Sequence, residues 1–167
     1  MKILFTVFML TLCSIAGFAQ GNSIEKDFER SKASYKLEKF SEGEDASSGY
    51  DYFVYKDKGK IVKVREVWSS LSYKTYRAED YYYKDGKLIA LVKYAFDSKY
   101  YKTAEKGRNV PFKEVEKLYF TDSKLTEWIE NGKPILNTDK RWQEREKEAL
   151  EAGKSQLENY NWLKKSD

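Results

Sequence analysis

The sequence contains no histidine, one cysteine, two methionines and two prolines in 167 residues. Histidine is the commonest general base near neutral pH, and the cysteine thiolate is the usual sulfur nucleophile and soft metal ligand. The single cysteine, Cys13, lies close to the N-terminus. The rest of the chain therefore has no disulfide, and histidine- or cysteine-dependent catalysis and thiolate metal sites are excluded from it.

The first residues have the pattern of a secretory signal peptide. Lys2 precedes an uninterrupted apolar stretch, and the small residues Gly17 and Ala19 close the segment. The stretch is short for a bilayer span of about 20 residues, and Leu12 stands where a lipoprotein signal usually has a small residue. We expect residues 1–19 to be cleaved, with no membrane span left, and residues 20–167 to form one periplasmic or secreted domain.

Charged side chains are abundant but nearly balanced, with 31 Lys and Arg against 27 Asp and Glu. Lysine and glutamate alternate through most of the chain, which is typical of a solvated surface rather than of a stripe that binds phosphates. We predict no nucleic-acid partner. The sequence also contains no glycine-rich phosphate loop, and the acidic segment Ser41–Ser48 has no calcium-loop spacing, so we predict no cofactor and no metal.

Three β-hairpins are predicted between residues 50 and 129, each with an aromatic residue before the turn and an aliphatic residue after it. Asp85-Gly86 suits a type I′ turn, and Gly59 suits the bulge position of a three-residue loop. A polar excursion at Phe96–Val110 carries a short strand around Tyr100–Ala104. The predicted strands and turns are Tyr50–Tyr55, Lys56–Lys60 and Ile61–Trp68; Tyr73–Tyr83, Lys84–Lys87 and Leu88–Phe96; and Val115–Phe120, Thr121–Lys124 and Leu125–Ile129.

Helices are predicted on both sides of the hairpins. Ile24, Phe28 and Tyr35 fall close to helical spacing and predict a helix over Ser23–Ser34, followed by a polar loop at Ser41–Ser48. Thr138 or Asp139 caps a long amphipathic helix that begins near Lys140 and continues to Leu163. Gly153 either breaks this helix or costs about 1 kcal/mol inside it, which close approach to a strand would offset. The predicted fold class is α+β, an antiparallel β-meander of about six strands with both helices packed on it.

Because side chains alternate along a strand, counting from the turns assigns the two faces of the sheet. The count pairs Tyr55 with Ile61, Tyr83 with Leu88 and Phe120 with Leu125 on one core face beneath the long helix. On the opposite face it predicts a binding set of aromatic and lysine side chains: Tyr52, Tyr82, Tyr119, Trp128, Lys84 and Lys87. This set forms a contact platform for protein or glycan, unless the N-terminal helix or the 96–110 excursion covers it as a second core layer. Ile89 and Leu91, assigned to the same face, favour the covered arrangement.

Two pairs of nearby carboxylates, Glu79/Asp80 and Glu114/Glu116, fall in strand-like segments. A glycosidase uses two carboxylates about 5–10 Å apart. Strand neighbours point to opposite faces, so Glu79 and Asp80 cannot converge on one substrate. We expect these groups to be ordinary surface ion pairs and predict no catalytic residues.

Two segments, Tyr81–Ile89 and Leu118–Ile129, together with Asn131-Gly132-Lys133, resemble a group of uncharacterised exported bacterial proteins. Those proteins carry tandem hairpins of the type Tyr-Tyr-Phe-x-Asp-Gly-Lys-Leu-Ile, and the hairpins are faintly similar to MORN repeats. The resemblance covers roughly Tyr50–Leu136, and Ser123 and Thr126 depart from the pattern. It implies an exported β-meander and no particular activity.

We therefore expect an exported, non-catalytic binding, inhibitor or accessory protein of the cell envelope. Its partner would be an envelope protein or glycan, and the lysines would steer an acidic partner. A carboxylate-dependent hydrolase of envelope glycans and a purely structural envelope component are the alternatives.

Overall fold

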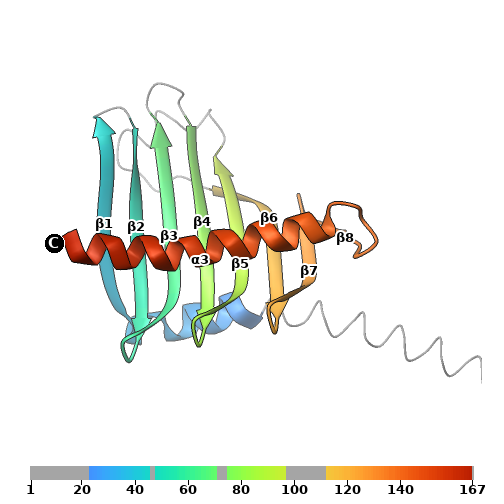
Figure 1. Ribbon diagram of the computed structural model, residues 1–167, viewed down its shortest axis with the longest axis horizontal. Coiled ribbons are helices and arrows are strands. Elements are labelled where there is room, and N and C mark those ends of the chain that lie inside the picture. The colour runs from blue at the N-terminus through green and yellow to red at the C-terminus, as the bar shows by residue number, and fades with distance from the viewer. Residues whose placement is uncertain (1–22, 46–47, 71–74, 97–111, 167) are drawn as a thin grey trace, which may run out of the picture.

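The computed structural model describes residues 23–45, 48–70, 75–96 and 112–166. They form an α+β fold whose eight antiparallel strands lie in one sheet in chain order (Figure 1). A helix at residues 23–31 and the 3-10 helix η1 (Lys32–Ser34) precede the sheet, and α3 (Trp142–Ser166) follows it. The strands are β1 (Lys36–Asp45), β2 (Ser48–Asp57), β3 (Lys60–Ser70), β4 (Thr75–Lys84), β5 (Lys87–Phe96), β6 (Phe112–Thr121), β7 (Lys124–Glu130) and β8 (Lys133–Ile135).

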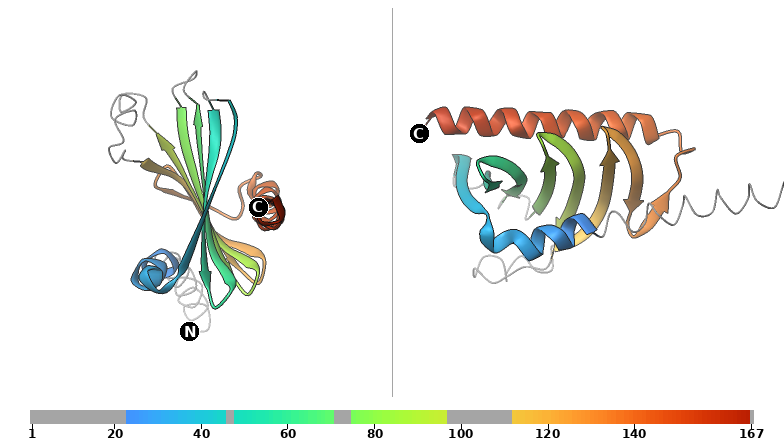
Figure 2. Two further views of the ribbon diagram at one scale, coloured as in Figure 1. Left: turned by 90° about the vertical axis from the view of Figure 1, so that its left-hand side faces the viewer. Right: turned by 90° about the horizontal axis from the view of Figure 1, so that it is seen from below.

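The sheet lies between two helices, so the fold has three layers. α3 runs across the strands on one face, and the N-terminal helix lies against the other face near the hairpin turns (Figures 1 and 2). We call these sides the α3 face and the N-helix face. Within the described ranges, none of the helices is both long and apolar enough to span a bilayer.

The prediction of six strands is wrong by two, because a strand lies at each end of the meander. β1 occupies the segment that was predicted as the polar loop Ser41–Ser48, and its Leu37 and Phe40 pair with Tyr55 and Tyr52. Its polar sequence suits an edge strand. β8 contains Pro134, which has no backbone N–H group to donate. An edge strand tolerates proline because only one of its sides is hydrogen-bonded to a neighbouring strand. The predicted signal peptide and the strand near residues 100–104 lie outside the described residues.

Two-residue turns connect β2 to β3, β4 to β5, β6 to β7 and β7 to β8. Both central residues of every turn have positive φ, the conformation of a type I′ turn, which matches the right-handed twist of the strands. The turns are Lys58-Gly59, Asp85-Gly86, Asp122-Ser123 and Asn131-Gly132. The first was predicted as a three-residue loop, which is wrong, since Asp57 pairs directly with Lys60.

A β-bulge follows each of the first three turns, because Val62, Ile89 and Thr126 have no partner across the ladder. The extra residue shifts the alternation by one position, so later side chains change face relative to an even count. For this reason the predicted face of Trp128 is wrong: it lies opposite Leu118 on the α3 face. The same shift places Leu91 on the α3 face.

The buried side chains form two clusters, one on each face. The pairs Tyr83–Leu88 and Phe120–Leu125 lie beneath α3 as predicted. The face predicted for Tyr55 is wrong. The first turn is shorter than predicted, so Ile61 pairs with Lys56 instead, and the Tyr55 side chain lies on the N-helix face. The second cluster consists of Phe28, Tyr82, Ala90, Val92 and Tyr119. Both faces are therefore partly buried, as in the alternative in which the N-terminal helix forms a second core layer.

α3 continues through Gly153 without a break. A Cβ atom at this position would lie 3.0 Å from Leu88 Cδ2, and the Gly153 carbonyl accepts a hydrogen bond of 2.8 Å from the Tyr83 hydroxyl. The glycine thus allows the helix to approach the second hairpin closely. Before the helix, Asp139 Oδ1 accepts a hydrogen bond of 2.9 Å from the Arg141 backbone N–H. Arg141 precedes the first helical residue, Trp142, so this bond orders the approach to α3 rather than capping its first turn as predicted.

Candidate functional site

The four aromatic side chains of the predicted binding set are buried. Tyr52, Tyr82, Tyr119 and Trp128 are 6%, 4%, 4% and 2% exposed. The N-terminal helix covers Tyr82 and Tyr119, as the second-layer alternative proposed, while Tyr52 and Trp128 face the α3 side. The prediction of an exposed aromatic platform is therefore wrong.

Lys84 and Lys87 are exposed and face each other beside the second turn, as predicted. They line a hollow of about 340 Å³ with Asp85, Asp122 and Phe120, between the second and third hairpins. The nearby Lys60–Asp85 ion pair, 2.9 Å long, is exposed on both sides. Exposed pairs of this kind contribute little binding or stability.

The N-helix face contains a buried ion cluster that the sequence did not reveal. Lys63 Nζ lies 2.8 Å from Asp80 Oδ2, and the two side chains are 4% and 2% exposed. Arg65 Nε lies 3.1 Å from the other carboxylate oxygen, and the Arg65 side chain is 32% exposed. The Tyr94 hydroxyl donates to Asp80 Oδ2 at 3.3 Å. Asp80 is thus ion-paired as expected, but it is buried rather than on the surface.

The cluster contains two cations and one carboxylate. Burial lowers the pKa of Lys63 below its usual range, against the attraction of Asp80. Aromatic rings of Phe28 and Tyr82, 4.5 and 4.7 Å from Lys63 Nζ, provide further contacts to the ammonium group. The cluster therefore has a net formal charge of +1, and Arg65 is the most exposed of its three ionic side chains.

Arg65 opens onto a pocket of about 220 Å³ whose other walls are Phe53, Tyr55 and Val67. We call it the Arg65 pocket. Two lysines stand beside its aromatic walls: Lys39 Nζ is 5.6 Å from the Phe53 ring and Lys32 Nζ is 5.9 Å from the Tyr55 ring. The site is therefore apolar inside and cationic at its base and rim.

The sequence analysis missed Phe53, Arg65 and Val67. A signal was present in the alternation of β3, where Lys63, Arg65 and Val67 occupy every second position and Phe53 is the cross-strand partner of Arg65. It was hidden because Tyr55, from which the count began, was placed on the wrong face.

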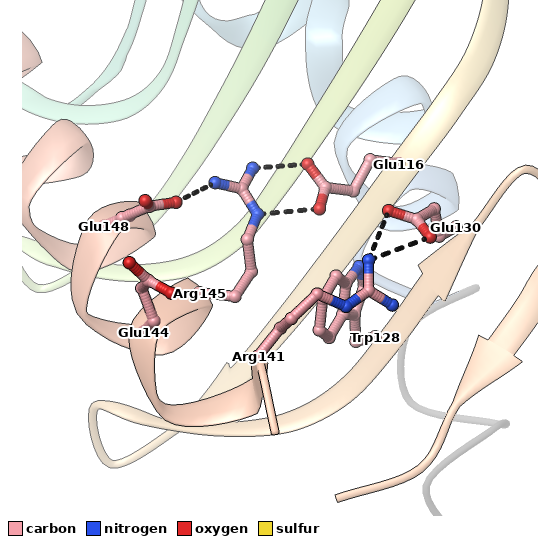
Figure 3. Close-up of a pocket in the computed structure, with 7 residues that line it drawn as sticks. All are labelled: Glu116, Trp128, Glu130, Arg141, Glu144, Arg145 and Glu148. Atoms are coloured by element: carbon pink, nitrogen blue, oxygen red, sulfur yellow. Dashed lines mark hydrogen bonds and ion pairs between the residues drawn. The ribbon is translucent and has the colours of Figure 1, made fainter. Parts of the chain in front are cut away.

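A second pocket, of about 360 Å³, lies where α3 begins, on the opposite face of the sheet (Figure 3). We call it the α3 pocket. Its lining is mostly charged and comes from β6, β7 and α3: Glu116, Trp128, Glu130, Arg141, Glu144, Arg145 and Glu148.

The two arginines of the α3 pocket fasten the helix to the sheet. Arg145 forms two hydrogen bonds with Glu116 and lies 2.7 Å from Glu148. Burial lowers its pKa, but these carboxylates raise the pKa above the usual value overall. Arg141 lies 3.4 Å from Glu130 and its guanidinium carbon is 4.9 Å from the centre of the Trp128 ring.

Among the described residues, no group of three or more acidic side chains is arranged to hold a metal ion. Searches with the chain found no matching family model, no matching curated protein and no matching solved structure.

Proposed function

We propose that the chain is an exported, non-catalytic binding protein of the cell envelope, and that it holds an acidic segment of a partner protein at the Arg65 pocket. The observation that supports this most is a half-buried guanidinium, backed by a buried ion cluster with one surplus positive charge, at the base of an apolar pocket.

The size of the pocket favours a side chain over a whole small molecule. Ligand and cofactor pockets usually have volumes of about 300–1,000 Å³, and the Arg65 pocket has about 220 Å³. Phe53, Tyr55 and Val67 offer apolar walls to an aromatic or aliphatic anchor residue. A carboxylate next to that anchor would meet Arg65.

The fixed position of Arg65 supports specific recognition rather than loose attraction. Arg65 Nε lies at ion-pair distance from Asp80 Oδ1, 3.1 Å, without a hydrogen bond between the two atoms, and the Tyr94 ring centre lies 5.4 Å from Arg65 Cζ. A guanidinium that is already oriented loses less entropy when it binds a carboxylate. Lys39 adds charge that attracts an acidic segment from a distance, whereas Lys32 is ion-paired with Glu29 at 3.5 Å.

Fluorescence anisotropy with labelled peptides tests this proposal. The probe is a short peptide with one phenylalanine flanked by aspartates and glutamates, and its counterpart carries lysines in place of the acids. We expect only the acidic peptide to bind, with affinity that falls as salt rises. Replacement of its phenylalanine by serine should weaken binding because the pocket is left unfilled.

Two arginine variants separate the site from general charge. Arg65→Gln should weaken binding of the acidic peptide at least tenfold, a change of about 1.4 kcal/mol. Arg77→Gln is the matched control, because Arg77 is exposed and stacks on Trp68, 4.8 Å from the ring centre, on the α3 face. Equal losses in the two variants, or equal binding of both peptides, would refute the proposal.

One observation favours the hydrolase as a second candidate. Glu66 and Glu79 are direct cross-strand partners on the α3 face. Burial raises the pKa of Glu66, and the charge of Glu79 raises it further, while Glu79 is ion-paired with Lys93 at 3.1 Å. A carboxyl with raised pKa beside an ionised carboxylate is the arrangement of an acid/base pair. Release of reducing ends from purified envelope glycan, lost in both Glu66→Gln and Glu79→Gln, would support it, and wild-type protein without such release would end it.

A further inference from the structure

The α3 pocket has a surplus of negative charge. Its lining supplies four carboxylates and two guanidinium groups, which leaves a formal charge of −2. Arg145 is engaged by Glu116 and Glu148, and Arg141 is engaged by Glu130 and by Asp139. Glu144 lines the pocket and has no ion-pair partner among the residues that the structure describes. The pocket as built attracts a cation.

A second, independent feature of the same pocket is a buried hydrogen-bond donor, the indole N–H of Trp128, that has no acceptor within the described part of the chain. The Trp128 side chain is 2% exposed. Arg141 covers the face of the ring, and in Figure 3 the nitrogen-bearing edge of the indole is turned toward the side of the pocket where Glu130 lies. A buried donor without an acceptor costs about 1–3 kcal/mol, so an oxygen placed there stabilises the complex.

We propose that the α3 pocket binds a primary ammonium group that has a hydroxyl or ether oxygen beside it, as in a 2-amino-2-deoxy sugar. The ammonium group lies among the carboxylates of the lining, and the oxygen accepts from Trp128 Nε1. The volume of about 360 Å³ is at the lower end for ligand pockets, which suits a ligand of this size. This site is separate from the Arg65 pocket, since it lies on the other face and takes the opposite charge.

The NMR signal of the Trp128 indole N–H reports directly whether a ligand occupies the α3 pocket. In a ¹⁵N–¹H correlation spectrum each tryptophan gives its own indole signal, and Trp128→Phe identifies the one that belongs to Trp128. We expect millimolar glucosamine to shift this signal, whereas glucose, which has no amine, and N-acetylglucosamine, which has no charge, leave it unchanged. Equal shifts with glucose, or no shift with glucosamine, would overturn the proposal.

Two variants of the helix provide the control. Glu144→Gln removes a carboxylate without an ion-pair partner, so it should weaken glucosamine binding at least fivefold. It should lower the melting temperature only slightly, through the lost charge in the first turn of α3. Glu151→Gln removes an exposed carboxylate of the same helix outside the pocket, paired with Lys147 at 3.8 Å, and should bind glucosamine like the wild type. Equal weakening in both variants would show attraction to the whole helix and refute a defined site.

Discussion

The Arg65 pocket and the α3 pocket are built from the same kinds of side chain, yet their net formal charges have opposite signs. Each places an arginine between a carboxylate and an aromatic ring: Arg65 with Asp80 and Tyr94, and Arg141 with Glu130 and Trp128. On the N-helix face two cations share one carboxylate, whereas on the α3 face carboxylates outnumber arginines. The balance of cationic and carboxylate side chains at each pocket, rather than the type of ion pair, determines the charge of the ligand that the pocket attracts.

The pockets also differ in how deeply their ion pairs are buried. Lys63 and Asp80 are almost inaccessible, while Arg145 and Glu116 are 17% and 12% exposed and Arg141 is 46% exposed. Buried charges depend strongly on their partners, and exposed charges do not. The variants below test this difference in order of expected size.

The largest effect is expected from Asp80→Asn. The change leaves Lys63 buried without a counter-charge and should lower the free energy of unfolding by about 3 kcal/mol, as measured by urea denaturation. Asp85→Asn is the matched control at an exposed ion pair and should leave stability almost unchanged. Similar small effects from both would show that the N-helix face has no special buried ion cluster.

A smaller effect is expected from the arginines of the α3 face. Arg145→Gln leaves Glu116 without its two hydrogen bonds and should cost about 2 kcal/mol in urea denaturation. Arg141→Gln should cost much less, because Arg141 is half exposed. If Arg141 proved the more costly of the two, burial would not be what sets the strength of these pairs.

The close approach of α3 to the second hairpin predicts compensation in a double mutant. Gly153→Ala should lower stability by about 1 kcal/mol, because overpacking against Leu88 exceeds the gain in helix propensity. In a Leu88→Ala background the same change should cost clearly less, since the two closest contacts, to the Leu88 Cδ atoms, are gone and only the contact to Cβ at 3.3 Å is left. Ser155→Ala, at an exposed position, controls for propensity, and a Gly153→Ala effect of equal sign and size would contradict the close contact.

An effect of similar size to that of Gly153→Ala, but dependent on pH, is expected at the far end of α3. Lys56 and then Lys36 hold the pKa of Glu38 at about 2, and Tyr160 of α3 donates to the same carboxylate at 2.9 Å. A lowered folded-state pKa gives stability that is present above the ordinary value of 4.5 and is lost as the pH falls toward 2.

We therefore expect wild type to exceed Glu38→Gln by about 1 kcal/mol near pH 6, with the difference vanishing near pH 2. Chemical denaturation over this range measures the difference. A gap that widens on acidification would contradict the role of Glu38 as an ionised partner of Lys56.

Local turn chemistry made much of the fold predictable. Asp85-Gly86 and the repeated aromatic–aliphatic pairs located the hairpins, and the spacing from Trp142 to Leu163 located the long helix. The bulge residues Val62, Ile89 and Thr126 have ordinary strand side chains, so nothing marks them as extra. One unmarked residue inverts every later assignment of face.

The candidate sites were less predictable, because they depend on which strands lie opposite each other. Arg65 and Asp80 are cross-strand partners fifteen positions apart, and Trp128 meets Arg141 only after α3 has turned back over the sheet. Lysines and glutamates alternate along most of the sequence, so those that become buried look like those that stay in water. The ion count of each pocket is a property of the packed sheet.

One NMR titration tests the opposite preferences of the two faces most directly. The Nε–H signal of Arg65 and the indole Nε1–H signal of Trp128 can be followed together in ¹⁵N-labelled protein, first with the acidic phenylalanine peptide and then with glucosamine. The account predicts that the peptide shifts only the Arg65 signal and that glucosamine shifts only the Trp128 signal. If both ligands moved the same signal, or each moved the other's, the account of two pockets with opposite surplus charge would be wrong.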